Sequence, residues 1–340
     1  MVMIVDTPAL AVLVKRVGVE TFLKELADRT EADFALWPSF EKSARLAAHS
    51  RVGVLELMPT SNAEWFSFKL VNGHPGNPAM GLLTVTAIGM LADVATGYPK
   101  LISEMTVLTA LRTAATSAMA ARRLANPGAT TMALIGTGAQ GEFQALAFKA
   151  CLGIKRIQYF DTDAHAMQKF ARNLADSSLE LIPAANADAA VKGAEIITTA
   201  TAVKAQQVVL TDRLVGSGVH VNAIGGDCPG KTELEAKLLA RARIFVEFLP
   251  QTLIEGDIQA LGPNAEATEL WRVITGQSPG RRTRDEVTIF DSVGFALEDY
   301  SALRYVFDKA RALGIGRELP MVPDPKDPKD LFGYLRGLSS

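Results

Sequence analysis

The sequence predicts an α/β protein in which a doubly wound parallel sheet is joined to a second unit of α+β type. From Thr130 onward, short apolar runs alternate with helical patterns, as in parallel strands connected by helical crossovers. Runs such as Met132–Ile135 are apolar without alternation, which is typical of strands covered on both faces. With 340 residues, 48% of them hydrophobic, the chain can bury the cores of two such units.

The first part of the chain follows another pattern. An amphipathic helical pattern from about Thr21 to His49 is followed by runs of strand character. These runs are Val52–Pro59, Trp65–Asn72 and Gly81–Val94. Turns are expected at Asn72-Gly73 and at Gly97-Tyr98-Pro99, since Asn, Gly and Pro favour turn conformations. The runs therefore predict an antiparallel or mixed sheet, and a helix from about Thr106 to Leu124 leads into the second unit.

The second part contains further strand candidates with helical patterns between them. The strand candidates are Thr131–Gly136, Arg156–Asp163, Leu179–Ala184, Ala194–Thr201, Val219–Gly226, Arg243–Phe248 and Val287–Gly294. Helical patterns run from about Gln140 to Leu152, and from the second strand up to Leu174. The tail, Pro323 to Leu338, is a Pro/Asp-rich loop followed by a short helix, whose apolar side chains we expect to pack on the first unit.

Composition and charge exclude several classes of protein. A formal net charge of -2 without a run of Lys and Arg gives no positive surface for nucleic acid. The apolar start is interrupted by Asp6 and Pro8 and does not fit a signal peptide. No later apolar run free of charges reaches the ~20 residues of a membrane helix. Two cysteines and four scattered histidines give neither a disulfide framework nor metal-ligand spacing. We therefore expect a cytoplasmic protein without nucleic-acid, membrane or metal partners.

A glycine-rich turn at the start of the second unit indicates a dinucleotide site. Gly136, Gly138 and Gly141 follow a predicted strand and open a helix, which is the GxGxxG context of a Rossmann-type fold. Glycines let the backbone approach a pyrophosphate, which the N–H groups at the helix start stabilise. Asp161 ends the next strand, where a carboxylate binds ribose hydroxyls and repels the extra phosphate of NADP. The sequence thus favours NAD; the alternative is that Asp161 only caps the following helix.

The carboxyl ends of the other strands add candidate residues, because ligands of open parallel sheets lie beyond these ends. That rule selects Thr201, the segment Asn222–Asp227 and Ser292. Asp227 is thereby placed beside a bound nicotinamide, where a carboxylate can carry protons; a solvated loop aspartate is the other interpretation. Thr232–Glu235 fits a capping box, so Asp227 precedes the predicted cap and is not the cap itself.

Charged residues of the first part have several possible roles. Arg112 is the only charged residue in Thr106–Ala121, so its guanidinium needs an anionic partner, either a structural carboxylate or that of a substrate. Lys69 alternates with apolar side chains, and periodicity alone favours a solvated lysine on the opposite face. Arg45 has no distinctive context, and Glu56, in an apolar strand, fits an outward-facing acid.

The chain resembles the ornithine cyclodeaminase and mu-crystallin family over nearly its whole length. The segments that carry the resemblance are KSARLAAHS, VGVLELMP, KLVNGHPGN, LRTAATSAMAA, ALIGTGAQGEFQALAF, NAIGGDCPGKTEL and DSVGFALEDY. The resemblance implies a homodimer in which residues 1–113, completed by 316–340, form a substrate-binding and dimerisation domain. Residues 114–315 would form a Rossmann-type domain that binds NAD.

The resemblance also implies roles for individual residues. Asp227 would be the acid and base near the reacting amines, and Arg45, Lys69 and Arg112 would clamp the substrate carboxylate. Glu56 and Val293 would line the substrate pocket. The residues implied to hold NAD are Thr84, Arg112, Gly136, Gly138, Ala139, Gln140, Asp161, Thr201, Asn222, Ala223, Ile224, Gly225, Lys231 and Ser292. From the residues alone, Lys231 is either a surface lysine or a cofactor contact.

The activity implied is the conversion of L-ornithine to L-proline and ammonia, in which NAD takes a hydride from the α-carbon and returns it after cyclisation. Two alternatives lie within the same family: a lysine cyclodeaminase, and an NAD(P)-dependent imine reductase or amino-acid dehydrogenase. A binding protein without catalysis, as some crystallins of this family suggest, is disfavoured by the presence of Asp227.

Overall fold

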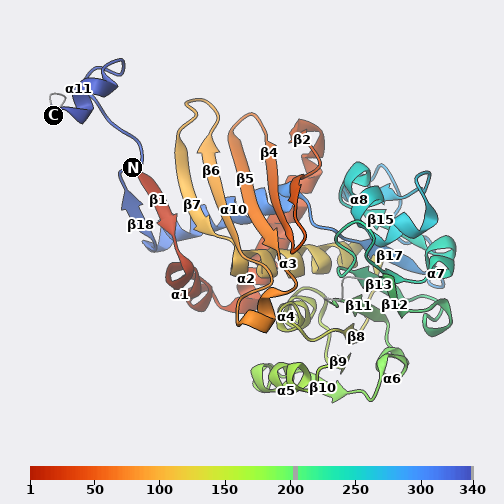
Figure 1. The fold of residues 1–340 in the computed structure, drawn as a ribbon. Coiled ribbons are helices and arrows are strands. Elements are labelled where there is room, and N and C mark those ends of the chain that lie inside the picture. Colours follow the sequence, from red (N-terminus) through yellow and green to blue (C-terminus); the bar gives the residue numbers. More distant parts are fainter. Residues whose placement is uncertain (202–205, 338–340) are drawn as a thin grey trace.

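Residues 1–201 and 206–337 are described by the structure, a computed structural model that contains two large sheets and the helices packed on them (Figure 1). One sheet is mixed and the other is entirely parallel. The predicted α/β fold is therefore confirmed. No helix in the described part of the chain combines the length and apolar character needed to cross a membrane.

The mixed sheet brings the two ends of the chain together. Its strands are β1 (Val2–Val5), β2 (Glu41–Lys42), β3 (Leu46–His49), β4 (Val54–Ser61), β5 (Trp65–Gly73), β6 (Ala87–Asp93), β7 (Pro99–Glu104) and β18 (Arg317–Leu319). They follow the order β18-β1-β7-β6-β5-β4-β2, and β3 also pairs with β4. β1 runs parallel to β7, and the other pairs are antiparallel.

The parallel sheet has the strand order of a dinucleotide-binding fold. Its strands are β8 (Thr131–Ile135), β9 (Arg156–Phe160), β10 (Glu180–Pro183), β11 (Ile196–Thr199), β13 (His220–Ala223), β15 (Arg243–Val246), β16 (Thr268–Glu269) and β17 (Thr288–Asp291). The order β10-β9-β8-β11-β13-β17-β15-β16 reverses its direction of winding between β8 and β11. A ligand crevice is expected at this switch point. Each strand predicted in this part of the sequence is confirmed.

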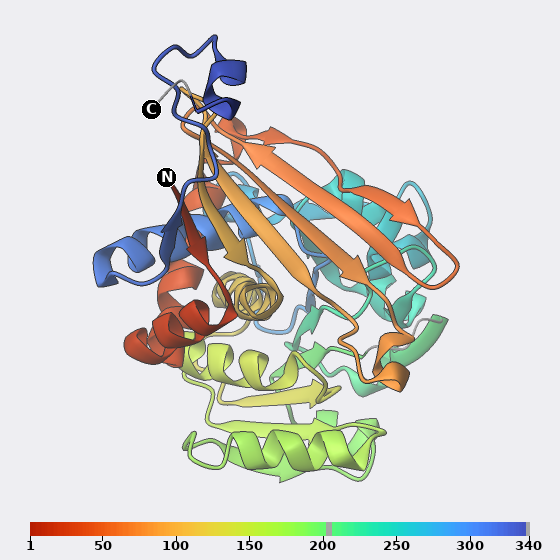
Figure 2. The same cartoon turned by 60° about the vertical axis from the view of Figure 1, so that its left-hand side comes forward.

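Three long helices connect the sheets. They are α2 (Val19–Ala35), α3 (Thr106–Leu124) and α10 (Ala296–Leu313). α10 follows β17 of the parallel sheet and then packs on β4, β5 and β6 of the mixed sheet. α3 packs on β6 on one side and on β13 and β17 on the other, so it lies between the sheets (Figure 2). The helix predicted from Thr106 to Leu124 is confirmed residue for residue.

Shorter helices complete the two units. They are α1 (Thr7–Val17), α4 (Gly141–Leu152), α5 (Ala164–Asn173), α6 (Ala187–Val191), α7 (Ala236–Arg241), α8 (Leu249–Glu255), α9 (Leu270–Ile274) and α11 (Leu331–Leu335), with 3-10 turns at Trp37–Ser39, Asn77–Met80, Asp212–Leu214 and Asp257–Leu261. α4 and α5 match the helical patterns predicted after the first two strands of the parallel sheet. The interrupted apolar start of the chain forms β1 and α1, with the Asp6 side chain capping α1.

The predicted helix from Thr21 to His49 is wrong beyond Ala35. α2 ends there, and the chain continues as a 3-10 turn, β2 and β3. Pro38 explains the end of the helix, because proline disfavours the helical conformation of the residue before it.

The predicted turn at Asn72-Gly73 is also wrong, because β5 continues through Gly73. The Asn72 side chain stabilises the extended chain instead, since its Oδ1 accepts a hydrogen bond from the Thr86 N–H at 2.6 Å. The turn at Gly97 is confirmed, with φ of 73° and an N–H that donates to the Asp93 carbonyl at 2.7 Å.

The predicted capping box at Thr232–Glu235 is wrong as well. Thr232–Leu234 is a short strand, β14, which pairs in parallel with β12 (Gln206–Leu210). α7 begins only at Ala236, with Glu235 as its N-cap residue. The Glu233 and Thr232 side chains are buried rather than exposed at a helix start, so pairing with β12 determines the local structure.

The C-terminal tail projects from the molecule instead of packing on the first unit as predicted (Figure 1). In α11 the side chains of Leu331, Phe332 and Leu335 are 57%, 69% and 80% exposed. The segment between β18 and α11 is rich in Pro and Asp, which favour extended and turn conformations over a compact return.

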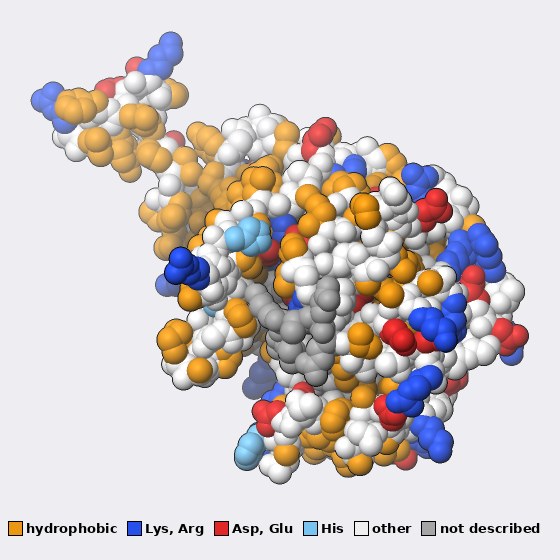
Figure 3. All heavy atoms as spheres, turned by 45° about the vertical axis from the view of Figure 1, so that its right-hand side comes forward, with side chains coloured by type: hydrophobic (Ala, Val, Ile, Leu, Met, Phe, Trp, Pro, Cys, Tyr) orange, Lys and Arg blue, Asp and Glu red, His pale blue; other side chains and the backbone are white. Residues whose placement is uncertain are grey.

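The face of the mixed sheet that packs on the helices carries both polar and apolar side chains. On β5, Ser67, Lys69 and Val71 point toward α10 and are buried, whereas Phe66 and Leu70 are 36% and 43% exposed on the other face. The predicted alternation is therefore correct, but the prediction that Lys69 is solvated is wrong. Hydrophobic side chains also gather on the surface between the projecting tail and the main body (Figure 3).

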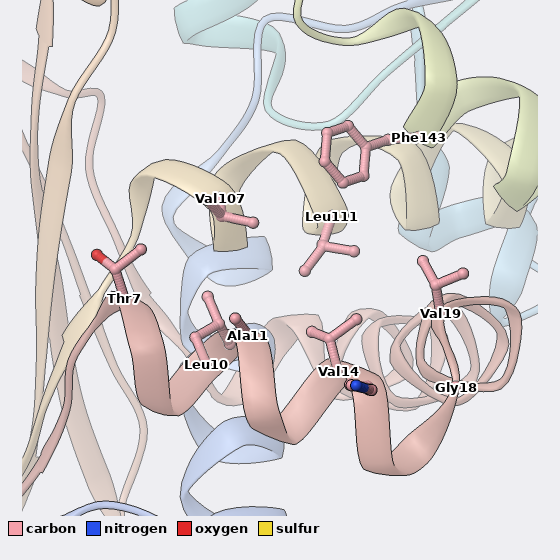
Figure 4. A pocket seen from close by; sticks show the side chains of 10 residues that line it. Thr7, Leu10, Ala11, Val14, Gly18, Val19, Val107, Leu111 and Phe143 are labelled. Carbon is pink, nitrogen blue, oxygen red and sulfur yellow. The ribbon is translucent and has the colours of Figure 1, made fainter. Parts of the chain in front are cut away.

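An apolar groove of about 400 Å³ lies between α1, α3 and α4 (Figure 4). Leu10, Val14, Val107, Leu111 and Phe143 point into it. The one charged residue that lines it is Lys15. It lacks the converging polar groups that orient a small polar ligand, so the functional site lies elsewhere.

Candidate functional site

The glycine-rich turn after β8 has the geometry of a dinucleotide site. Gly136 has φ of 99°, and a Cβ at this position would lie 2.5 Å from the Ala200 carbonyl oxygen. Glycine is therefore required both for the backbone conformation and for the close contact with the end of β11. Gly138 and Ala139 are exposed where α4 begins, and the Gln140 Oε1 atom is buried without a hydrogen-bond partner. The turn thus leaves the start of α4 open to an anionic group.

Asp161 lies directly beyond β9, beside the glycine-rich turn. Its Oδ2 atom accepts hydrogen bonds from the N–H of Thr137 at 2.6 Å and from its hydroxyl at 3.2 Å. Its Oδ1 atom accepts from the Asp163 N–H at 2.9 Å. The cap of α5 is Asp163 and not Asp161. Each carboxylate oxygen has a second lone pair, so Asp161 retains the capacity to bind ribose hydroxyls.

The loop from Ile224 to Lys231 places Asp227 at the carboxyl end of the parallel sheet. The Asp227 side chain is 53% exposed, and its Oδ1 lies 3.2 Å from Lys231 Nζ. Lys231 is buried, and its Nζ also donates to the Thr201 carbonyl at 3.1 Å. Lys231 is therefore not a surface lysine; it joins the loop of Asp227 to the end of β11.

Polar residues at the strand ends connect to further buried groups. The Ser292 hydroxyl donates to Glu247 Oε1 at 2.5 Å, and the Gly294 N–H donates to the same oxygen at 3.2 Å. The Asn222 amide donates to Gln144 Oε1 at 3.3 Å. Ala223 is the last residue of β13, next to Ile224. Thr84 lies between β5 and β6, and its carbonyl accepts from the His74 N–H at 2.8 Å.

A cluster of buried ion pairs lies where α10 crosses the inner face of the mixed sheet. Lys69 Nζ lies 2.9 Å from Asp299 Oδ2, and Arg112 Nε lies 2.9 Å from Asp299 Oδ1. Arg112 Nη1 also pairs with Glu298. These side chains are at most 5% exposed. Arg112 packs closely on Gly294, where a Cβ would lie 2.7 Å from its Nη1 atom.

Arg45 joins the mixed sheet to the parallel sheet. Its Nη1 lies 3.0 Å from Glu56 Oε2 on β4, and its Nε lies 3.1 Å from Glu255 Oε2 on α8. Its Nη2 donates to the carbonyls of Val293 at 2.6 Å and of Gly294 at 2.8 Å. Glu56 is therefore not an outward-facing acid, and Val293 contributes its carbonyl to the site.

Burial changes the protonation of these groups. Burial, helped by the charge of Arg112, lowers the pKa of Lys69 to about 8, although Asp299 opposes this. Burial raises the pKa of Glu298 to about 8 against the effect of Arg112. Burial also raises the pKa of Glu255 to about 7, and the negative charges of Glu56 and Asp227 add to this shift. Asp227 and Arg45 therefore have opposite effects on the pKa of one side chain, Glu255.

The acids that pair with the cations could not be identified from the sequence. Glu298 and Asp299 lie within DSVGFALEDY, but their partners are 186 and 230 residues away. Glu247 and Glu255 likewise interact only through the fold. The sequence does indicate that an arginine buried in the helix Thr106–Ala121 needs a carboxylate partner, without identifying the partner. Among residues 1–201 and 206–337, no group of three or more His, Cys, Asp and Glu side chains is arranged to hold a metal ion.

Comparisons with known proteins give a consistent result. A model of the ornithine cyclodeaminase/mu-crystallin family matches residues 9–314. An ornithine cyclodeaminase of Brucella suis is 56% identical over 323 residues, which are 95% of this chain and 90% of the relative. A solved lysine cyclodeaminase, studied for its recognition of L-lysine, L-ornithine and L-2,4-diaminobutyric acid, has a TM-score of 0.89 and 32% identity, covering 97% of this chain and 98% of its own. An archaeal alanine dehydrogenase dimer with bound NAD has a TM-score of 0.86 and 28% identity, covering 94% and 99%.

Replacement of Asp299 by Asn removes the carboxylate that Lys69 and Arg112 share. Because buried charge is left without its partner, the free energy of unfolding is expected to fall by about 3–5 kcal/mol in urea denaturation. Asp308→Asn on the same helix is the control. Its carboxylate is 55% exposed and 3.5 Å from Arg29, so a loss of less than about 1 kcal/mol is expected. Equal losses for the two variants would contradict the role of the cluster.

The raised pKa of Glu255 predicts a pH-dependent stability. A carboxyl group whose pKa rises on folding stabilises the folded protein below its unfolded pKa, and this contribution is lost as pH rises through the folded pKa. Relative to a Glu255→Gln variant, the wild-type protein should lose free energy of unfolding between about pH 4.5 and about pH 7. Urea unfolding of both proteins across this range tests the prediction, and a difference that does not change with pH would refute it.

Proposed function

The chain belongs to the ornithine cyclodeaminase/mu-crystallin family, and we propose that it is an NAD-dependent ornithine cyclodeaminase of the cytoplasm, which converts L-ornithine to L-proline and ammonia. The family predicted from the sequence is confirmed, and so is the enzyme class, a carbon–nitrogen lyase, by the similarity to named ornithine cyclodeaminases. No net oxidation accompanies this reaction.

The observation that carries the proposal is that an exposed acid and a group of cations lie beyond two neighbouring strand ends, because Asp227 follows β13 while Arg45 and Arg112 contact Gly294 beyond β17. Asp227 acts electrostatically on Glu255, which pairs with Arg45 at 3.1 Å. Lys69 and Arg112 meet at Asp299. A diamino acid has the complementary charges, since its carboxylate suits the cations and its distal ammonium suits the acids. Alanine lacks the second ammonium and would leave the acidic side without a partner.

NAD is the cofactor that these residues fit. The start of α4, with Gly136, Gly138, Ala139 and Gln140, suits the pyrophosphate, and Asp161 suits the ribose hydroxyls. Thr84, Thr201, Asn222 to Gly225, Lys231 and Ser292 would hold the nicotinamide half, with Arg112 between cofactor and substrate. When bound, NAD accepts a hydride from the substrate α-carbon and returns it after ring closure.

The cations orient the substrate. A guanidinium has five N–H donors, and the ion pairs of Arg112 with Glu298 and Asp299 involve its Nη1 and Nε atoms. We assign its Nη2 side, together with Lys69 and Arg45, to the substrate carboxylate. Holding a substrate in a reactive orientation can contribute several powers of ten in rate. Glu56 and the carbonyl of Val293 keep Arg45 in place.

Asp227 carries the protons. Its carboxylate takes a proton from the distal ammonium, which must be neutral to attack the α-carbon, and delivers one to the departing α-amine. Lys231 Nζ, 3.2 Å from its Oδ1, anchors this carboxylate through an ion pair.

Two other functions have support in the comparisons. A lysine cyclodeaminase differs by one methylene of substrate, for which a pocket discriminates by only about 1–3 kcal/mol. An amino-acid dehydrogenase would use the same clamp and release the reduced cofactor. The 56% identity to an ornithine cyclodeaminase, against 32% to the lysine enzyme and 28% to the alanine dehydrogenase, favours ornithine.

The deciding experiment mixes the protein with L-ornithine and a catalytic amount of NAD. Ammonia and proline should form in equal amounts, far above the NAD supplied, while absorbance of NADH stays low. NADH that accumulates in step with substrate loss would instead establish a dehydrogenase. L-Lysine in place of L-ornithine is the matched control, and faster turnover of lysine would overturn the proposed substrate.

Replacement of Asp227 by Asn keeps the shape of the side chain and removes its basicity. Turnover of ornithine should fall by about 10²–10⁴-fold, the usual contribution of general acid–base catalysis. Binding of NAD, followed by fluorescence titration, should stay within about twofold because Asp227 is assigned to the substrate side. Full activity of the variant would remove Asp227 from the mechanism.

We further propose that the protein is a homodimer, with residues 1–113 and 316–340 forming the substrate and dimerisation domain and residues 114–315 the NAD domain. The support is the outer face of the mixed sheet, where Leu55, Leu70 and Ile88 are 49%, 43% and 47% exposed on neighbouring strands. A contiguous apolar surface of this kind is typical of a protein–protein contact.

A Leu70→Glu variant tests this dimer surface. A charge in a desolvated contact is costly, so sedimentation velocity should show a shift from dimer to monomer at micromolar concentration. Val12→Glu, at a site on α1 that is 45% exposed, is the control and should leave the dimer intact. Dimers that persist in Leu70→Glu as in the control would place the contact elsewhere.

A further inference from the structure

The loop of Asp227 begins with two glycines, and two buried carboxyl groups occupy the space that side chains at these positions would need. A Cβ at Gly225 would lie 2.1 Å from both carboxyl oxygens of Glu233, and a Cβ at Gly226 would lie 2.7 Å from Asp257 Oδ2. Neither glycine is among those with positive φ. These glycines are therefore needed for space and not for an unusual backbone conformation.

Glu233 belongs to a closed ring of contacts around Asp227. Its Oε1 accepts a hydrogen bond from the Thr201 N–H at 3.0 Å and another from the Thr201 hydroxyl. The Thr201 carbonyl accepts from Lys231 Nζ at 3.1 Å, and Lys231 reaches Asp227 at 3.2 Å. Asp227 is joined through Gly226 to Gly225, which packs on Glu233 and closes the ring.

Asp257 binds the backbone of Glu233. Its Oδ1 accepts hydrogen bonds from the N–H groups of Glu233 at 2.5 Å and of Leu234 at 2.8 Å. The backbone of Asp257 is fixed in turn by Asp291, which accepts from the N–H groups of Asp257 at 3.0 Å and of Ile258 at 2.8 Å. Glu233, Asp257 and Asp291 are at most 2% exposed.

We propose that Glu233 and Asp257 are positioning residues for catalysis, which hold the backbone of Gly225 and Gly226 and thereby set the place of the Asp227 carboxylate. The inference rests on the proposed function, in which Asp227 moves protons. The Asp227 side chain is 53% exposed and its tether is Lys231, so packing does not fix it directly. The position of the Asp227 side chain is set by the backbone of Gly225 and Gly226, which precede it.

Carboxyl groups suit this task better than apolar side chains of the same size. Each accepts backbone donors from a neighbouring segment while its carboxyl group lies against a glycine, so it contacts two segments at once. Burial raises the pKa of Glu233 to about 7, against hydrogen bonds from Thr201 and Thr199, and burial also raises the pKa of Asp257. A neutral carboxyl group can be buried at this depth without a counter-ion.

The packing itself is tested by a size exchange in the protein without ligands. Gly225→Ala alone should lower Tm by roughly 5 °C or more, because the new methyl group meets the Glu233 carboxyl. The double variant Gly225→Ala/Glu233→Ala should melt above Gly225→Ala, since the shortened side chain makes room. Gly225→Ala/Glu195→Ala is the control, because Glu195 accepts the Thr130 and Thr131 N–H groups at the start of β8. Losses that simply add in both double variants would overturn the proposal.

The catalytic role is tested by steady-state kinetics with ornithine. Glu233→Ala should lower kcat by about 10²-fold, the cost of a misplacement of about 1 Å, while KM for ornithine stays within about twofold. Glu233→Gln keeps an acceptor oxygen and the volume, so it should recover most of kcat. Glu195→Ala should keep the wild-type kcat, because Glu195 bonds Thr130 and Thr131 and is not part of the ring of contacts that includes Asp227. Equal kcat for Glu233→Ala and the wild type, or a loss confined to KM, would refute a positioning role.

These two experiments separate the proposals from each other. An inactive wild-type protein would refute the proposed cyclodeaminase, whereas the melting temperatures of the size exchange would still report on the packing. An active wild type with additive melting losses would refute the positioning role and leave the proposed activity in place.

Discussion

A buried charge needs a partner, and this constraint joins the parts of the molecule. Lys69 on β5, Arg112 on α3 and the acids Glu298 and Asp299 on α10 meet with at most 5% exposure. Removing such ions from water costs several kcal/mol each unless they are paired. Three segments that are far apart in the sequence must therefore meet at one point, and the mixed sheet takes its position relative to the parallel sheet from this meeting.

The elements that depend on local sequence pattern were predicted correctly. The strands of the parallel sheet, α3 and the turn at Gly136 follow from apolar runs and glycine spacing, which reflect contacts close in the chain. The helix predicted beyond Ala35 and the capping box at Thr232 failed because local patterns there compete with pairing to β4 and β12. Sequence pattern alone does not include these distant strands.

The site was harder to predict because its residues act in pairs across the chain. Periodicity placed Lys69 correctly on the face of β5 opposite Phe66 and Leu70. The prediction failed because it assumed that the face with the apolar side chains is the buried one, whereas Lys69 lies on the buried face. The apolar context of Arg112 predicted an anionic partner, whereas nothing in the sequence around Asp299, 187 positions later, indicated that it is this partner. The resemblance to a family supplied candidates for the substrate and cofactor residues, but not the buried acids that pair with Lys69, Arg112 and Arg45.

The segment from Ser292 to Asp299 connects the end of the parallel sheet to the cluster of buried ion pairs. Ser292 and Gly294 bind Glu247 at the end of the parallel sheet, and Asp299 holds both Lys69 and Arg112. Eight consecutive residues, half of them in the first turn of α10, thus separate the Glu247 contacts from the ion pairs of Asp299. An insertion or deletion within this segment would therefore change the spacing between these two groups of contacts.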